Sequence, residues 1–232
     1  MYTNEQLIEF CQEAVRIPSY SGQEKGVAEF MKRKMEEYGF DEVIIDKYGS
    51  VLGTINGKRP GKTILMDGHI DTVDVIDAPQ WKHDPFGGEI VDGRIYGRGT
   101  SDMKSGAAAM TMAIRAIQAC GIRLKGDLIV EYVMDEELTG NGTLACVMKG
   151  YKADAGICCE TSSMCVQPGS IGRIWFTINV KGKAAGIQKH REGVSGIDLG
   201  YLVCKAVEEY EALRMSKISH PLYPDIPSSI PC

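Results

Sequence analysis

Six acidic or imidazole side chains lie at four places in the chain, each beside a strand-like segment or at the start of a helix-like one. They are His69 with Asp71, then Asp102, the pair Glu136 and Glu137, and Glu160. Imidazole and carboxylates, without thiolate pairs, are a ligand set suited to catalytic zinc. A neighbouring carboxylate can act as base for a water that the metal activates. The sequence therefore indicates a metal site, provided that the fold brings the four places together.

Taken one at a time, these residues also have structural interpretations. A His-x-Asp pair is often structural, an aspartate such as Asp102 after Gly99 can be a helix N-cap, and adjacent glutamates often lie on a solvated face. However, Glu136 and Glu137 follow an apolar segment, where carboxylates are costly unless they are paired or bound to cations. We therefore favour the metal interpretation, in which Asp102 is shared between two ions and Asp71 accepts a hydrogen bond from the imidazole.

Alternating helix and strand signals position these residues. One helix is predicted to end near residue 16, and three more are predicted at 23–38, 104–120 and 144–149. Strands are predicted at 42–46 and 51–55 as a hairpin, and at 63–66, 128–134 and 155–159. This order indicates an α/β fold with a mixed, mainly parallel sheet and flanking helices. Open α/β sheets gather their functional residues at the ends of the strands.

The pattern changes after Gly172. Apolar and polar residues alternate from Ile174 to Val180, which predicts a strand with one exposed face. A helix is predicted over 194–213, with Ile197, Leu199, Leu202, Val203 and Val207 facing inward. We therefore expect two domains, at residues 1–172 and 173–232.

Composition excludes some classes of protein. The net charge of −5 argues against nucleic-acid binding, which favours a basic excess. We expect neither a secretory signal nor a membrane span, and therefore a cytoplasmic protein. The eight cysteines form no CxxC pair, so we expect small buried apolar residues rather than disulfides.

Three segments resemble a known enzyme family. Residues 65–73 (LMDGHIDTV), 96–106 (YGRGTSDMKSG) and 135–137 (DEE) are similar, in order and spacing, to the metal motifs of one group of zinc hydrolases. This group contains acetylornithine deacetylase, succinyl-diaminopimelate desuccinylase, aminoacylase and dipeptidases. The resemblance implies a zinc-peptidase-like catalytic domain at 1–172, followed by an incomplete α+β lid domain at 173–232 that could form a homodimer.

The resemblance also implies an activity. A water bridging two zinc ions would attack the amide bond of an N-acyl-amino acid or small peptide, and Co²⁺ or Mn²⁺ could replace zinc. Neither nucleic acid nor membrane is an expected partner. The implied metal ligands are His69, Asp102, Glu137 and Glu160. The implied catalytic residues are Glu136, as general base, and Asp71, which supports His69. A cis peptide is expected between Asp102 and Met103.

Two departures from the family pattern lead to an alternative. The chain stops inside the expected lid, before a final histidine for the second zinc, and His190 and His220 are expected to be surface or packing residues. Gly186 stands where the family has a lid histidine that polarises the substrate carbonyl. The alternative is a truncated or degenerate member that binds metal but is catalytically inactive.

Overall fold

The computed structural model describes residues 3–58, 60–170, 172 and 174–221. The chain divides into two compact units, Met1–Cys165 and Val166–Cys232. All six predicted site residues fall in the first unit.

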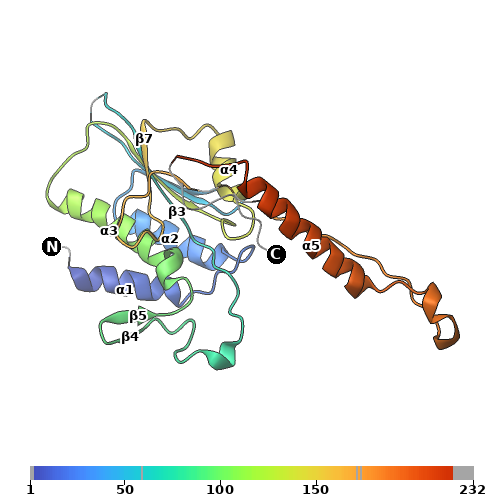
Figure 1. Cartoon of the computed structure of the whole chain (residues 1–232). Coiled ribbons are helices and arrows are strands. Elements are labelled where there is room, and N and C mark those ends of the chain that lie inside the picture. The colour runs from blue at the N-terminus through green and yellow to red at the C-terminus, as the bar shows by residue number, and fades with distance from the viewer. Residues whose placement is uncertain (1–2, 59, 171, 173, 222–232) are drawn as a thin grey trace. The chain divides into compact units, whose positions relative to one another are not determined.

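A five-stranded sheet forms the centre of the first unit (Figure 1). Its strands are β1 (Glu42–Ile45), β2 (Val51–Ile55), β3 (Ile64–His69), β6 (Leu128–Val133) and β7 (Ala155–Cys158), in the order β1-β2-β6-β3-β7. β2 pairs antiparallel with β1 and β6, whereas β3 pairs parallel with β6 and β7. The predicted mixed sheet with flanking helices is confirmed, and two of these four pairings are parallel.

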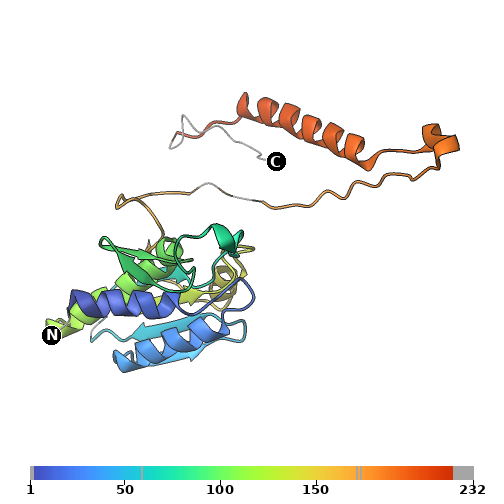
Figure 2. The same ribbon diagram turned by 90° about the horizontal axis from the view of Figure 1, so that it is seen from below.

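Three helices pack on one face of the sheet: α1 (Asn4–Val15), α2 (Lys25–Glu37) and α3 (Ser105–Ala119). α1 begins with a capping box, in which Thr3 and Gln6 satisfy each other's backbone N–H groups. The rings of Phe10 and Phe30 stack with centroids 5.3 Å apart, which holds α1 and α2 side by side (Figure 2). These rings belong to the same buried cluster as Val130 and Tyr132 of β6.

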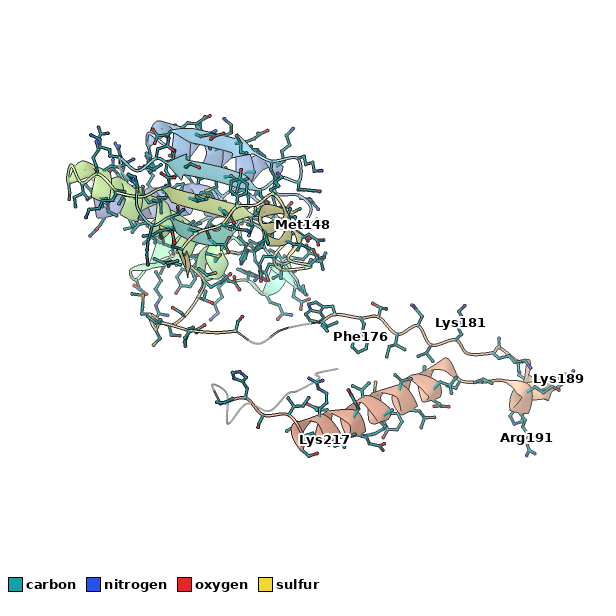
Figure 3. The ribbon with its side chains drawn as sticks, turned by 90° about the horizontal axis from the view of Figure 1, so that it is seen from above. Met148, Phe176, Lys181, Lys189, Arg191 and Lys217 are labelled. Atoms are coloured by element: carbon teal, nitrogen blue, oxygen red, sulfur yellow. The ribbon has the colours of Figure 1, made fainter. Side chains whose placement is uncertain are left out.

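A fourth helix, α4 (Asn141–Met148), packs on the opposite face. Its Cys146 lies in a small cluster with Leu52 and Val133. Because successive residues of β6 point to opposite faces, this strand contributes to both clusters and is almost entirely buried. The outer side of α4 is apolar but exposed: Met148 is 79% exposed (Figure 3).

The connection between β3 and α3 contains short elements. They are η1 (Ala78–Gln80), the two-stranded hairpin β4 (Glu89–Val91) with β5 (Arg94–Tyr96), and η2 (Thr100–Lys104). These elements order the segment that leads from the end of β3 to Asp102.

The second unit contains η3 (Ile187–Glu192) and α5 (Gly196–Met215), and none of its described residues is buried. The strand predicted from Ile174 to Val180 does not form, although Phe176 and Lys181 lie on an extended segment (Figure 3). A strand needs a run of hydrogen bonds to a neighbouring strand, and no strand is assigned among the described residues of this unit, where an isolated bridge joins Lys183 and Val194.

The predicted burial of apolar residues along α5 was also wrong. Ile197 is 85% exposed and Leu202 is 61% exposed, because the described residues of this unit offer no sheet for α5 to cover. The helix itself was predicted, since its formation depends on local signals: the Ser195 side chain accepts a hydrogen bond from the Asp198 N–H at its start.

The expectation for the cysteines was only partly right. Cys11 and Cys146 are buried and Cys159 is half-buried, whereas Cys120, Cys158, Cys165 and Cys204 are exposed. Cys232 lies outside the described residues. No helix among the described residues combines the length and the apolar composition that a membrane crossing requires.

Candidate metal centre

The predicted site residues meet at the edge of the sheet where the three parallel strands end. His69 is the last residue of β3, Glu136 and Glu137 follow β6, and Glu160 follows β7. Because β6, β3 and β7 are neighbours and run in the same direction, their ends lie side by side. Asp102 comes to the same place from η2. The crevice beyond such strand ends is where open α/β sheets bind ligands.

His69 is the centre of this arrangement. Its imidazole is only 1% exposed, and Nε2 faces three carboxylates. The oxygens are Asp102 Oδ1 at 2.9 Å, Glu160 Oε1 at 3.1 Å and Glu136 Oε2 at 3.8 Å. These carboxylates are 36–55% exposed, so they form a partly open rim around a buried ring.

The other ring nitrogen of His69 shows how Asp71 acts. Nδ1 lies 3.0 Å from the backbone carbonyl oxygen of Asp71 and 3.4 Å from its carboxylate Oδ1. An N–H at Nδ1 that donates to this carbonyl leaves the Nε2 lone pair for a ligand. We expected the Asp71 side chain to orient the ring, but the main-chain oxygen is the closer acceptor.

The Asp71 carboxylate is fully buried and holds the loop after β6. It accepts hydrogen bonds from the backbone N–H groups of Glu136 and Glu137, each at 3.1 Å. Asp71 therefore fixes the main chain of both paired glutamates.

The electrostatics reflect many carboxylates around one imidazole. Burial alone would lower the pKa of His69, but hydrogen bonds to Asp102, Asp71 and Glu160 raise it to about 12. The hydrogen bond with His69 lowers the pKa of Asp102. Burial, followed by the charge of Asp102, raises the pKa of Glu137. Such a surplus of negative charge favours a cation in place of the imidazole proton.

The donor atoms are spaced as a divalent ion requires. Two groups of three residues place one ligand atom each within 4.8 Å of one another: His69 with Glu136 and Glu160, and His69 with Asp102 and Glu137. Ligands of tetrahedral zinc stand roughly 3.3 Å apart, given metal–ligand distances near 2 Å. The separations of 2.9 and 3.1 Å around Nε2 are close to this value. The residues therefore fit zinc or a similar ion.

Close packing holds the start of α3 against the residue that follows β7. A Cβ added to Gly106, in the first turn of α3, would lie 2.1 Å from the Cys159 carbonyl oxygen, so only glycine lets the helix approach the end of β7. Gly99 adopts a left-handed φ of +77° just before η2. The expected cis peptide between Asp102 and Met103 is confirmed.

Two further carboxyl groups lie near the predicted metal ligands, and sequence reasoning did not assign them to the site. Asp67 and Glu131 are register partners on β3 and β6, and each has one buried oxygen with no hydrogen-bond partner among the described residues. Burial raises the pKa of Asp67 to about 6, and burial with the charge of Asp67 raises the pKa of Glu131 to about 7. This face of the sheet therefore favours neutral carboxyl groups.

Sequence reasoning also missed Ser21, whose Oγ donates to Asp71 Oδ2 at 2.7 Å. The contact spans fifty residues, so no local spacing could reveal it. His190 and His220 are exposed in the second unit, as expected for surface residues.

Comparison with family models gives one match. The model of peptidase family M20/M25/M40 matches residues 65–221, which is more than half of the chain.

Curated relatives share substantial identity. The chain is 37% identical over 165 residues to N-formyl-4-amino-5-aminomethyl-2-methylpyrimidine deformylase of Bacillus subtilis, covering 68% of this chain and 38% of the relative. It is 42% identical over 101 residues to a succinyl-diaminopimelate desuccinylase of Cereibacter sphaeroides, covering 43% of this chain and 27% of the relative. The chain thus spans well under half the length of these relatives.

Solved structures share the fold. A tripeptidase from Staphylococcus aureus superposes with a TM-score of 0.59 at 21% identity, covering 88% of this chain and 57% of that one. At this identity the likeness describes the architecture of the chain alone.

Proposed function

Because the chain belongs to peptidase family M20/M25/M40, we propose that it carries out metal-dependent hydrolysis of an amide bond in an N-acyl-amino acid or small peptide. The observation that carries this proposal is the buried His69 ring with carboxylates from three separate segments around its Nε2. Two relatives are named for the removal of a formyl and a succinyl group, which supports an acyl-amine bond as the target.

We assign the metal ligands to His69, Asp102, Glu137 and Glu160. Zinc suits this nitrogen and oxygen set, and Co²⁺ or Mn²⁺ could take its place. A bound ion would lower the pKa of the attacking water and polarise the substrate carbonyl. His69 and Glu160 would hold one ion, Glu137 the second, and Asp102 would be shared.

Glu136 is the general base in this proposal. Its side chain is 42% exposed and lies beside the proposed ligands, so it can receive a proton from the attacking water. The same carboxyl can then deliver that proton to the leaving amine. Asp71 does not touch the reacting atoms: it holds the Glu136 and Glu137 amides at 3.1 Å and so sets where the base lies.

The second unit contributes less to the proposal. We propose that residues 173–232 belong to a lid that covers the substrate and pairs two copies of the protein. This role, a cytoplasmic location and the domain boundary at residue 172 stay predictions.

A zinc titration and a hydrolysis assay test the proposal together. Calorimetry on the chain stripped with a chelator would give zinc affinity, and formyl-, acetyl- and succinyl-amino acids with simple dipeptides would serve as substrates. Glu136→Gln is the decisive variant, because it keeps the shape of the side chain but cannot take a proton. We expect it to retain zinc and to lose about 10²- to 10⁴-fold in kcat.

Several results would speak against the proposal. Zinc binding without hydrolysis of any substrate would favour the inactive alternative. Failure to bind zinc, cobalt or manganese would remove the metal assignment itself. Hydrolysis that survives Glu136→Gln would assign the base elsewhere.

A further inference from the structure

The loop that joins α1 to α2 contacts the residues that follow β3 and β6, two of the three strands whose ends form the site. We call residues 19–24 the N-terminal strap. Ser19 Oγ donates to the Ile70 carbonyl oxygen at 2.7 Å, and the Thr72 N–H donates to the Ser19 carbonyl oxygen at 2.8 Å. Both contacts are made immediately after His69, at the end of β3. The strap lies outside residues 65–221, the range that the family model matches.

The second contact of the strap is with Asp71. Ser21 Oγ donates to Asp71 Oδ2 at 2.7 Å, and the same oxygen accepts the Glu137 N–H at 3.1 Å. Asp71 is buried, so its carboxylate is shielded from the solvent. A buried carboxylate is held by its donors, so the Ser21 hydroxyl restricts the group that fixes the paired glutamates.

The third contact is with the end of β6. Glu24 is only 5% exposed, and its Oε1 accepts hydrogen bonds from the N–H groups of Gly22 at 2.9 Å and Asp135 at 3.2 Å. Asp135 has a left-handed φ of 59° and immediately precedes Glu136. Non-glycine residues seldom adopt this conformation, so the position benefits from a partner that holds its backbone.

We propose that the N-terminal strap is a positioning element for the metal centre, in which Ser21 and Glu24 fix the paired glutamates relative to His69. Neither residue touches the ion or the reacting atoms in this proposal. Ser21 acts through Asp71, and Glu24 acts through Asp135. The inference rests on the proposed function for the identity of the centre, but its geometry is independent of the substrate.

Two substitutions that shorten a side chain test the strap, and the zinc affinity of the chain is the measurement. Ser21→Ala removes the donor to Asp71, and Glu24→Ala removes the acceptor for Asp135. We expect each to weaken zinc binding by about 10-fold or more, in the range typical of partners that orient metal ligands. The absorption spectrum of the Co²⁺-loaded chain should change as well, because it reports on ligand geometry. Ser21→Thr and Glu24→Gln keep the donor and the acceptor, and should restore most of the affinity.

Thr3→Ala is the matched control. It removes the capping box of α1 and so lowers the stability of the chain, but the hydrogen bonds described for Thr3 are with Gln6 of the same helix. We expect this variant to unfold at a lower temperature while its zinc affinity and Co²⁺ spectrum stay those of the wild type. A general loss of stability is thereby separated from a loss of positioning.

Amide hydrogen exchange on the metal-free chain gives a readout that needs neither zinc nor turnover. Ser21→Ala should speed exchange at the Glu136 and Glu137 amides by about fivefold or more, and Glu24→Ala should do so at Asp135, whereas Thr3→Ala should not. Unchanged exchange in both strap variants would overturn the inference. So would wild-type zinc affinity and Co²⁺ spectra in both. If the wild type bound no metal, the proposed function would fail, and the exchange data alone would decide the role of the strap.

Discussion

The two units of this chain use similar residues with opposite outcomes. Phe10 of the first unit is 1% exposed and stacks on Phe30, whereas Phe176 of the second is 64% exposed. Both units contain a long helix that begins with a side-chain cap, but α1 buries four residues and α5 buries none. The difference lies in what surrounds each element, since among the described residues a sheet that helices can cover is found in the first unit alone.

This comparison separates two kinds of sequence information. Caps and helical periodicity act within one segment, so they determine α5 although none of its residues is buried. An alternating pattern predicts a strand only if a second strand pairs with it, and the structure assigns no strand between Ile174 and Val180.

The largest expected contrast is between two phenylalanines. Phe10→Ala should lower the free energy of unfolding by about 3–5 kcal/mol, because it empties a packed site between α1 and α2. Phe176→Ala should change it by no more than about 0.5 kcal/mol. Urea unfolding of the full chain followed by circular dichroism measures both. A comparable loss in the two variants would mean that the second unit has a core of its own in solution.

The second contrast is between two histidines. His69→Ala should weaken zinc binding by more than about 100-fold, since His69 belongs to both ligand groups. Removing a metal ligand should cost more affinity than removing a residue that only orients a ligand. His190→Ala should leave the affinity unchanged, because this exposed residue lies in the second unit. Calorimetric titration measures both affinities. Weaker binding by the His190 variant would extend the ligand set beyond the first unit.

Alanine substitutions at two helical glycines should change stability by smaller amounts, and in opposite directions. Gly106→Ala should destabilise the first unit by about 1–3 kcal/mol, because its Cβ would meet the Cys159 backbone. Gly200 of α5 has nothing within 4 Å of an added Cβ, so Gly200→Ala should stabilise the helix by about 0.5–1 kcal/mol. Thermal unfolding tests the first and helix content the second. Loss of helix on the Gly200 change would reveal a neighbour against α5.

The last contrast concerns how the stability of the fold depends on pH. Burial raises the pKa of Glu131 from its ordinary 4.5 to about 7, so the neutral carboxyl is favoured in the fold. Its contribution to stability is complete below pH 4.5 and is lost as the pH rises through 7. Glu131→Gln should therefore gain up to about 3 kcal/mol of stability over the wild type at pH 8 relative to pH 4.

Glu208→Gln is the control for the pH experiment. Glu208 lies on the exposed surface of α5 beside Lys205, so its replacement should leave the pH dependence unaltered. Urea unfolding at several pH values measures both variants. If Glu131→Gln followed the wild-type curve, the buried carboxyl would be charged across this range.

Much of the fold could be predicted because its signals are local. The apolar segments before His69, Glu136 and Glu160 marked strands, and the ends of parallel strands meet at one edge of a sheet. The cis peptide after Asp102 was expected only through resemblance to a family.

Other features of the site could not be predicted because they depend on distant contacts. Ser21 reaches Asp71 across fifty residues, and Glu24 reaches Asp135 across more than a hundred. The closer acceptor for His69 is a backbone carbonyl, which no residue type reveals. Likewise, the alternation of apolar and polar residues after Ile174 predicted a strand, but the sequence pattern does not show whether a second strand pairs with it.

The single imidazole shared by the two ligand groups has a consequence for stoichiometry. One Nε2 atom can coordinate only one ion, so the first ion to load takes the nitrogen. Within the described part of the chain, a second ion would be left with oxygen donors, which suit harder cations than zinc. Occupancy should therefore proceed in two unequal steps, with a tight first equivalent and a loose second one that magnesium or manganese could contest.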